Sequence, residues 1–283
     1  MEEKTMLELS MKILCANGIT KCVSCGIDEV HLVAALEYEE GDRIVIEVSE
    51  SKQYLVVQVD DALTPALIYL KKNSLEFKIP FGEKRNSYSP KVFYGNRHYL
   101  YARVATKGEV SAYRNLALNP IDQNLMGQNE EAEYYPHARA NVETRGEAVF
   151  AARNAIDGIR ENRSHGEWPY GSWGINRRPD ASFTLEFGRE VLVDQIVLYT
   201  RADFPHDNWW KQVTFVFSDG TSLDFSMEKS QQAHCFRFEK KRIHSLTMEK
   251  LIASSDPSPF PALSQIEVYG TEVIAENEEY HET

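Results

Sequence analysis

The sequence lacks the long apolar runs that membrane proteins need. None of its 283 residues form a run of eighteen apolar positions, the minimum for a membrane-spanning helix. The first residues, MEEKTMLELSMKIL, are acidic and have no basic start, continuous apolar stretch or small-residue cleavage site. We therefore expect a protein that does not cross a membrane and is cytoplasmic.

Positive charge is also scarce. Lys and Arg number 31 against 43 Asp and Glu, which gives a formal net charge of −12. This excess of negative charge repels phosphate backbones and anionic lipid surfaces. It disfavours nucleic acid and membranes as partners and suits a neutral or cationic ligand.

There are four cysteines, and three of them crowd the N-terminus at Cys15, Cys22 and Cys25, far from Cys235. We predict free thiols in a reducing compartment rather than a disulfide framework. The single C-x-x-C pair lacks the second pair of ligands that zinc requires, although Cys15 and His31 offer an alternative set. Small buried hydrophobic residues near a turn are the favoured interpretation.

Recognisable catalytic motifs are missing as well. The chain has no G-x-S-x-G elbow, phosphate-binding P-loop, G-x-G-x-x-G fingerprint or H-E-x-x-H pair. Nothing in the sequence therefore indicates a catalytic nucleophile or a nucleotide site.

The first half of the chain instead shows the two-residue period of β-strands. Leu7, Leu9, Met11 and Ile13 alternate with polar residues, and a helix over 6–14 is the minority alternative. Similar short runs recur at about ten-residue spacing, which is typical of a β-sandwich or jelly roll. We predict an N-terminal sandwich over 1–110.

Residues 111–135 break this pattern with Pro, Gly and Asn, which predicts a connecting segment. Strand patterns then resume over 136–273, with a helix-compatible run at 148–156 that ends before Gly158. The turn Ser218-Asp219-Gly220 between alternating apolar runs predicts a hairpin. The end of the chain, 274–283, reads as an acidic tail.

Two segments, HGEWPYGSWGIN at 165–176 and RADFPHDNWW at 201–210, fit neither a strand nor a helix. Both combine aromatic rings with polar groups, and loops of this kind on a rigid scaffold suit sugar recognition. Rings would stack on the apolar face of a sugar while polar groups bond its hydroxyls. The predicted ligand-binding residues are His165, Trp168, Tyr170, Arg201, Asp203, His206, Asp207 and Trp209.

Other interpretations of these loops stay open. Arg201 with a loop aspartate could form an internal salt bridge instead of a sugar contact. His165, Glu167 and the pair His206-Asp207 could form a metal site or an acid/base pair if the loops meet. Because strand neighbours point to opposite faces, one ring of Trp209-Trp210 should be inward and the other outward or in the loop cluster.

The order of signals in residues 141–273 resembles that of galactose-binding-like jelly rolls. It runs from Asn154-Ala155-Ile156-Asp157-Gly158 through Trp173, FTLEFG at 183–188 and VLVDQIVL at 191–198 to IEVYG at 266–270. The resemblance is to the coagulation-factor C-type (discoidin) domains and related carbohydrate-binding modules. YLVVQVDDALTPALIYL at 54–70 also resembles part of a carbohydrate-binding jelly roll.

The resemblance implies a non-catalytic domain that binds a glycan through loops at one end, with Trp173 in the core. It also implies a structural calcium ion beside the turn, carried over to Asn154 and Asp157. Gln265 stands where relatives often have an acid, and the flanking disulfide of secreted relatives is absent.

We therefore expect an all-β protein of two tandem jelly-roll β-sandwiches, the second of the discoidin type, that binds carbohydrate without catalysis. One alternative is a cytoplasmic sugar-active hydrolase or isomerase, with or without a metal, that uses the same loops. Another is an assembly module that forms a homo-oligomer through them.

Overall fold

The computed structural model describes residues 6–123, 132–162, 165–202 and 207–273. Over these ranges the chain is almost entirely β-strand and turn, and the longest α-helix is α1 (Lys107–Ser111). Within the same ranges, no helix has both the length and the apolar character that a membrane crossing demands. The all-β expectation is confirmed.

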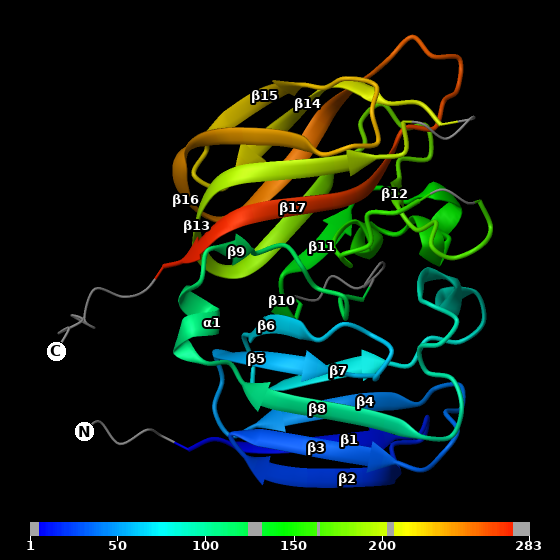
Figure 1. Ribbon diagram of the computed structural model, residues 1–283, viewed down its shortest axis with the longest axis vertical. Helices are drawn as coiled ribbons and strands as arrows, with labels where there is room; N and C mark the ends of the chain where they lie inside the picture. Colours follow the sequence, from blue (N-terminus) through cyan, green and yellow to red (C-terminus); the bar gives the residue numbers. More distant parts are fainter. Residues whose placement is uncertain (1–5, 124–131, 163–164, 203–206, 274–283) are drawn as a thin grey trace, which may run out of the picture.

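Residues before about 105, together with one short later strand, form two antiparallel sheets (Figure 1). One sheet has the order β2-β1-β4-β7 and the other β10-β6-β5-β8-β3. The strands are β1 (Glu8–Leu14), β2 (Thr20–Ile27), β3 (Glu29–Ala34), β4 (Arg43–Val48), β5 (Gln53–Gln58), β6 (Ala66–Leu70), β7 (Ser74–Lys78), β8 (His98–Val104) and β10 (Tyr134–Tyr135). We call these the N-terminal sheets.

The apolar face of β1 behaves as its alternation predicts. Leu9, Met11 and Ile13 are at most 2% exposed and belong to the same core cluster as Leu55 and Leu100 of the other sheet. Burying apolar area in this way is the main force that holds two sheets together. The helical alternative for residues 6–14 is wrong.

The cysteine interpretation needs a correction. Cys25 is exposed, and Cys15 and Cys22 are only partly buried. Cys22 and Cys25 lie on β2, a strand at the edge of its sheet, where the outward side faces solvent.

The C-terminal half forms one eight-stranded antiparallel sheet (Figure 1), the C-terminal sheet, whose main order is β12-β17-β13-β16-β14-β15. Two further strands lie off this path, where β11 pairs with β13 and β9 with β17. The strands are β9 (Arg114–Asn115), β11 (His137–Ala140), β12 (Trp173–Gly174), β13 (Phe183–Thr200), β14 (Trp210–Phe217), β15 (Ser222–Ser226), β16 (His234–Ala253) and β17 (Ala262–Glu272).

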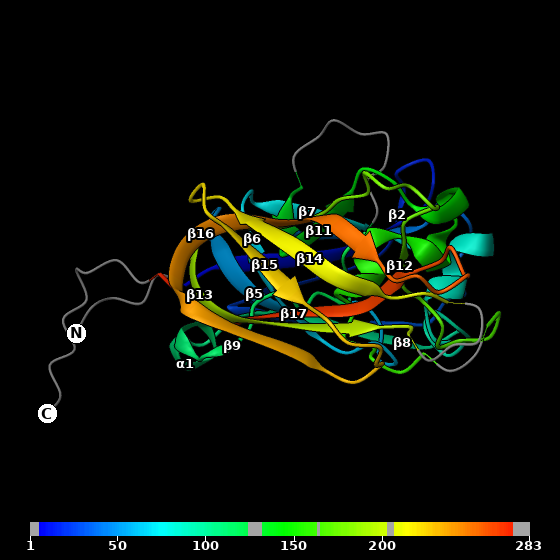
Figure 2. The same cartoon turned by 90° about the horizontal axis from the view of Figure 1, so that it is seen from above.

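Strands β13 and β16 are long and curve together, as seen from above in Figure 2. Their register shifts between Glu186 and Val191, around Gly188. Gly188 has φ +69°, and a Cβ there would lie 2.2 Å from the Tyr135 ring, so only glycine fits this bend. The curved sheet encloses a second core cluster that includes Phe215 of β14 and Ile266 of β17.

The predicted hairpin is confirmed, since β14 pairs with β15 across a turn in which Gly220 has φ +85°. The helix-compatible run 148–156 is instead two 3-10 turns, η3 (Ala148–Phe150) and η4 (Ala152–Ala155), with Ala151 extended between them. Other groups take the carbonyls that a helix would use. The Asn154 side chain donates to Ala148 O, and Ser172 N donates to Val149 O.

The segment 111–135 contributes to both clusters. Leu116 and Ala117 lie in the C-terminal core, whereas Ile121 and Tyr134 lie in the N-terminal core. Polar contacts also cross between the sheets, because the Tyr54 hydroxyl donates to Glu272 at 2.8 Å.

Candidate functional site

Strand pairing and contacts between loops bring three loops of the C-terminal sheet together. Thr200 at the end of β13 pairs with Leu263, and Gly174 of β12 pairs with Ala262. Trp210 at the start of β14 pairs with Ala253 at the end of β16. Because β13 and β16 are antiparallel, the end of β16 lies opposite the start of β13. Contacts between the loops bring the two places together: Asn208 forms a bridge with Pro261, and Ser254 N donates to Trp209 O. We call the region where the loops over 159–172, 201–209 and 254–261 meet the loop end.

Arg201 ties the first two of these loops together. Its side chain is 2% exposed, and Nε bonds Asp207 Oδ2 at 2.5 Å. Nη1 donates to Asn162 Oδ1 at 2.5 Å and to the carbonyl oxygen of Tyr170 at 2.9 Å. Arg201 and Asp207 are thus buried and bonded within the loops, which is the internal salt-bridge alternative. Contrary to the prediction, Arg201 and Asp207 do not face outward towards a ligand.

Asn208 ties the second loop to the third. Its side chain donates to Asp256 O at 3.3 Å and accepts from the Ser254 hydroxyl at 2.6 Å. Its backbone N donates to Phe260 O, and the guanidinium carbon of Arg177 lies 4.5 Å from the Phe260 ring centre. Sequence reasoning missed Asn208 because its partners lie about fifty residues further on, beyond any local pattern.

The aromatic residues of the first loop lie at the surface of this framework. The Trp168 side chain is 38% exposed, and the peptide bond to Pro169 is cis. His165 is exposed, and its ring meets that of Tyr170 edge-on with 6.2 Å between the centres. Tyr170 itself is 9% exposed. Trp168 and His165 are therefore exposed at the surface, and the buried Tyr170 ring packs against that of His165.

The other tryptophans divide as expected. Trp173 and Trp210 are fully buried with ring centres 6.3 Å apart, and Trp173 Nε1 donates to Val142 O. Trp209 is half-buried, so the two neighbouring tryptophans differ in burial as predicted. Asp203 and His206 lie outside the described residues.

Carboxylates stand beside the aromatic loop. Burial raises the pKa of Tyr170, and the nearby carboxylates of Glu147 and Glu83 raise it further, so its phenol stays protonated and can donate a hydrogen bond. The hydrogen bond from Arg145 lowers the pKa of Glu147. Glu83 comes from the 3-10 turn η1 (Gly82–Ser87) of the N-terminal half and accepts from Ala148 N at 3.3 Å. Glu83 lies more than sixty residues before the loop, so no local pattern predicts its place here.

The residues proposed for calcium do not fit the ion. Asn154 Oδ1 accepts a 2.9 Å hydrogen bond from Arg153, whose Nη1 also lies 4.0 Å from Asp157 Oδ2. Burial raises the pKa of Asp157 to about 7, against the opposing effect of Arg153. Gln265 is buried, and its amide oxygen accepts from Gly158 N. Across the described ranges, no group of three His, Cys, Asp or Glu side chains has the arrangement of a metal site.

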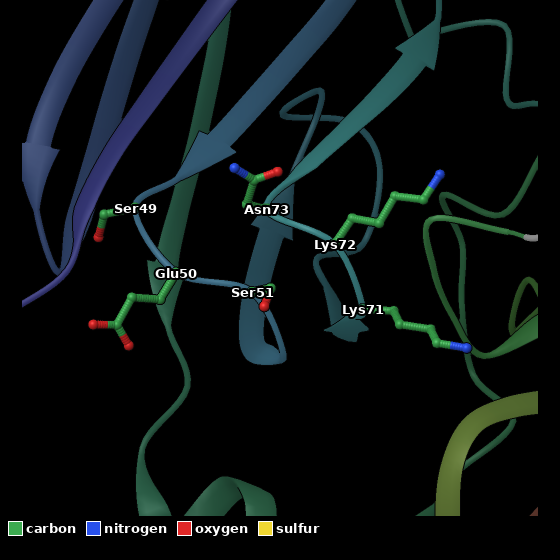
Figure 3. Close-up of a pocket in the computed structure, with 6 residues that line it drawn as sticks. All are labelled: Ser49, Glu50, Ser51, Lys71, Lys72 and Asn73. Carbon is green, nitrogen blue, oxygen red and sulfur yellow. The ribbon is translucent and has the colours of Figure 1, made fainter.

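A shallow hollow elsewhere is a weaker candidate. It lies between the β4–β5 and β6–β7 connections and is lined by Ser49, Glu50, Ser51, Lys71, Lys72 and Asn73. Figure 3 shows the side chains of Lys71 and Lys72 pointing away from that of Glu50. Polar groups that do not converge are a poor basis for recognising one ligand.

No protein-family model and no curated protein matches the sequence. Solved structures similar to part of the chain include a chitosan-binding module of a Paenibacillus chitosanase/glucanase, with 18% identity and a TM-score of 0.38. That match covers 55% of this chain and 98% of the module. A fucose-binding module of Streptococcus pneumoniae has 13% identity and a TM-score of 0.40, with 56% of this chain and 98% of the module covered.

A third similar structure is a Clostridium perfringens module solved with GalNAc-β-1,3-galactose. It has 18% identity and a TM-score of 0.37, and the match covers 47% of this chain and 94% of the module. Scores at this level carry no argument about the ligand of this chain. Several of the solved structures that about half of the chain resembles are carbohydrate-binding modules.

Proposed function

We propose that this protein binds a carbohydrate, a glycan or a small sugar, at the loop end of the C-terminal sheet and does not catalyse a reaction there. The observation that carries the proposal is an exposed aromatic surface on a fixed frame. Trp168 is 38% exposed on a loop that the buried Arg201 holds in place.

The physical argument concerns the cost of binding. A ring that is already held in place loses little freedom when a sugar stacks on it. Hydrogen bonds from Arg201 and Asn208 connect all three loops, so the frame exists before the ligand arrives. Such preorganisation favours binding of small polar molecules that offer few contacts.

The roles differ among the predicted residues. Trp168 stacks on the sugar ring, while His165 and the protonated phenol of Tyr170 form hydrogen bonds with the hydroxyl groups of the sugar. Arg201 and Asp207 are positioning residues that act through the loops. Trp209, Asp203 and His206 keep their predicted contact roles on the basis of sequence alone.

The test is binding of the whole protein to an array of mono- and oligosaccharides, followed by calorimetry on the hits. We expect saturable binding that Trp168→Ala weakens about tenfold or more, a loss of about 1.4 kcal/mol or more. Tyr94→Ala is the matched control, because Tyr94 is 75% exposed on the N-terminal half. A folded protein that binds no sugar would refute the proposal, and so would equal weakening by both variants.

A further inference from the structure

A buried positive charge lies beside the turn at Asn154–Gly158. Arg153, directly before it, is 5% exposed, and all three of its guanidinium nitrogens bond to oxygen. Nη1 donates to Asn154 Oδ1, Nε to the carbonyl oxygen of Asp122 and Nη2 to that of Pro120, each at 2.9 Å. A carboxylate oxygen of Asp157 lies 4.0 Å from Nη1.

These four oxygens are of the kinds that bind calcium. Carbonyl, amide and carboxylate oxygens are its usual protein ligands. Here they surround a guanidinium instead, and the Tyr88 ring covers that group with its centre 4.7 Å from the guanidinium carbon. The buried Arg153 charge is therefore hydrogen-bonded, as a buried charge must be, and it is also stacked on an aromatic ring.

We propose that the Arg153 guanidinium stands in for a calcium ion in this turn, so that the protein is folded and stable without calcium. Arginine stays protonated at any physiological pH, so the charge is permanent. A bound ion would come and go with the calcium concentration. This inference does not depend on the proposed sugar binding.

With a guanidinium in place of a calcium ion, the cation also connects different parts of the chain. Pro120 and Asp122 belong to the segment between the two cores, and Tyr88 belongs to the N-terminal core. Arg153 itself lies on η4, which packs on the C-terminal core. One covalently attached cation thus joins the turn to the N-terminal sheets.

The test compares thermal unfolding of the full chain in EDTA and in millimolar calcium, together with calcium titration by calorimetry. For the wild type we expect the same Tm in both conditions and no saturable heat. Arg153→Ser removes the guanidinium and leaves the oxygens around a space. We expect this variant to have a lower Tm in EDTA and to regain several degrees with calcium, because an ion that binds only the folded state stabilises it.

Arg178→Ser is the control, since Arg178 is an exposed arginine that pairs with Asp180. It should remain indifferent to calcium. A wild-type Tm that rises with calcium in a saturable way would overturn the proposal. An Arg153→Ser variant that folds but ignores calcium would also overturn it. If that variant folds in neither condition, the wild-type titration decides alone.

Discussion

Arg201 Nη1 donates a 2.9 Å hydrogen bond to the carbonyl oxygen of Tyr170, across 31 positions of the chain. The same guanidinium bonds the buried carboxylate of Asp207. Arg201 is therefore a part of the frame, and removing it disturbs two loops at once.

Arg201→Ala should lower the free energy of unfolding by about 3–5 kcal/mol, because it removes a cation that a buried carboxylate bonds. Arg201→Lys should recover only part of this, since an ammonium cannot replace a planar fork with several donors. Urea denaturation at neutral pH measures both. A loss below about 1 kcal/mol for Arg201→Ala would contradict the frame role.

Trp168→Ala should leave stability almost unchanged, within about 0.5–1 kcal/mol, because the side chain is exposed and lies outside both cores. Thermal unfolding alongside the binding assay separates this effect from that of Arg201→Ala. The two variants should therefore lose affinity for different reasons, one by a missing contact and one by loosened loops. Strong destabilisation by Trp168→Ala would show that the ring serves the fold instead.

Trp209 and Trp210 provide an internal comparison. Trp210→Ala should cost about 3–5 kcal/mol, since it empties a fully buried site that touches Trp173. Trp209→Ala should cost clearly less, because Trp209 is only half-buried. Denaturant titrations of the two variants in parallel check the difference, and equal losses would mean that both rings serve the core.

Ionisation of Glu272 should contribute to how the free energy of unfolding depends on pH in the acid range. Burial opposes its ionisation, but hydrogen bonds and charge from Arg189 and Arg114 outweigh this and lower the pKa of Glu272 below its ordinary 4.5. An acid with a lowered pKa stabilises the fold above its ordinary pKa, and this contribution fades as the pH falls through the lowered value. Glu272→Gln should cost about 3–5 kcal/mol at pH 7 and a smaller amount in acid well below pH 4.5.

The control for Glu272 is Glu190→Gln, a carboxylate that is 59% exposed and lies 3.5 Å from Arg242. It should change stability by no more than about 0.5 kcal/mol. Urea titrations between pH 7 and pH 3 measure both variants. An unchanged cost of Glu272→Gln across that range would show that its ionisation does not contribute.

Local patterns predicted much of this fold. Alternation located β1 and its buried face, and Asp219-Gly220 located the β14–β15 turn. Each of these signals is carried by neighbouring residues, so a single sequence contains it. The run 148–156 misled because its apolar spacing suits a helix, while the side chain of Asn154 and the backbone of Ser172 take the carbonyls that a helix needs.

The loop end was predicted in its aromatic part and not in its frame. Aromatic and Pro/Gly clustering marks the loop around Trp168 without any knowledge of its partners. The burial of Arg201 depends on Asn162 and Tyr170, and the position of Asn208 depends on Ser254 and Asp256. Such pairings come from the register of β13, β14, β16 and β17, which one sequence does not reveal.

The contacts of Arg153 also bear on how the chain can be cut. A fragment that starts at residue 136 would contain Arg153 and Glu272 but not Pro120, Asp122 or Tyr54, their bonding partners. In this fragment the Arg153 guanidinium would lose two of its acceptors and the Tyr88 ring that covers it, and would be open to water. The C-terminal half expressed by itself would thus expose a surface that is covered in the full chain. Ligand binding is better measured on the full chain.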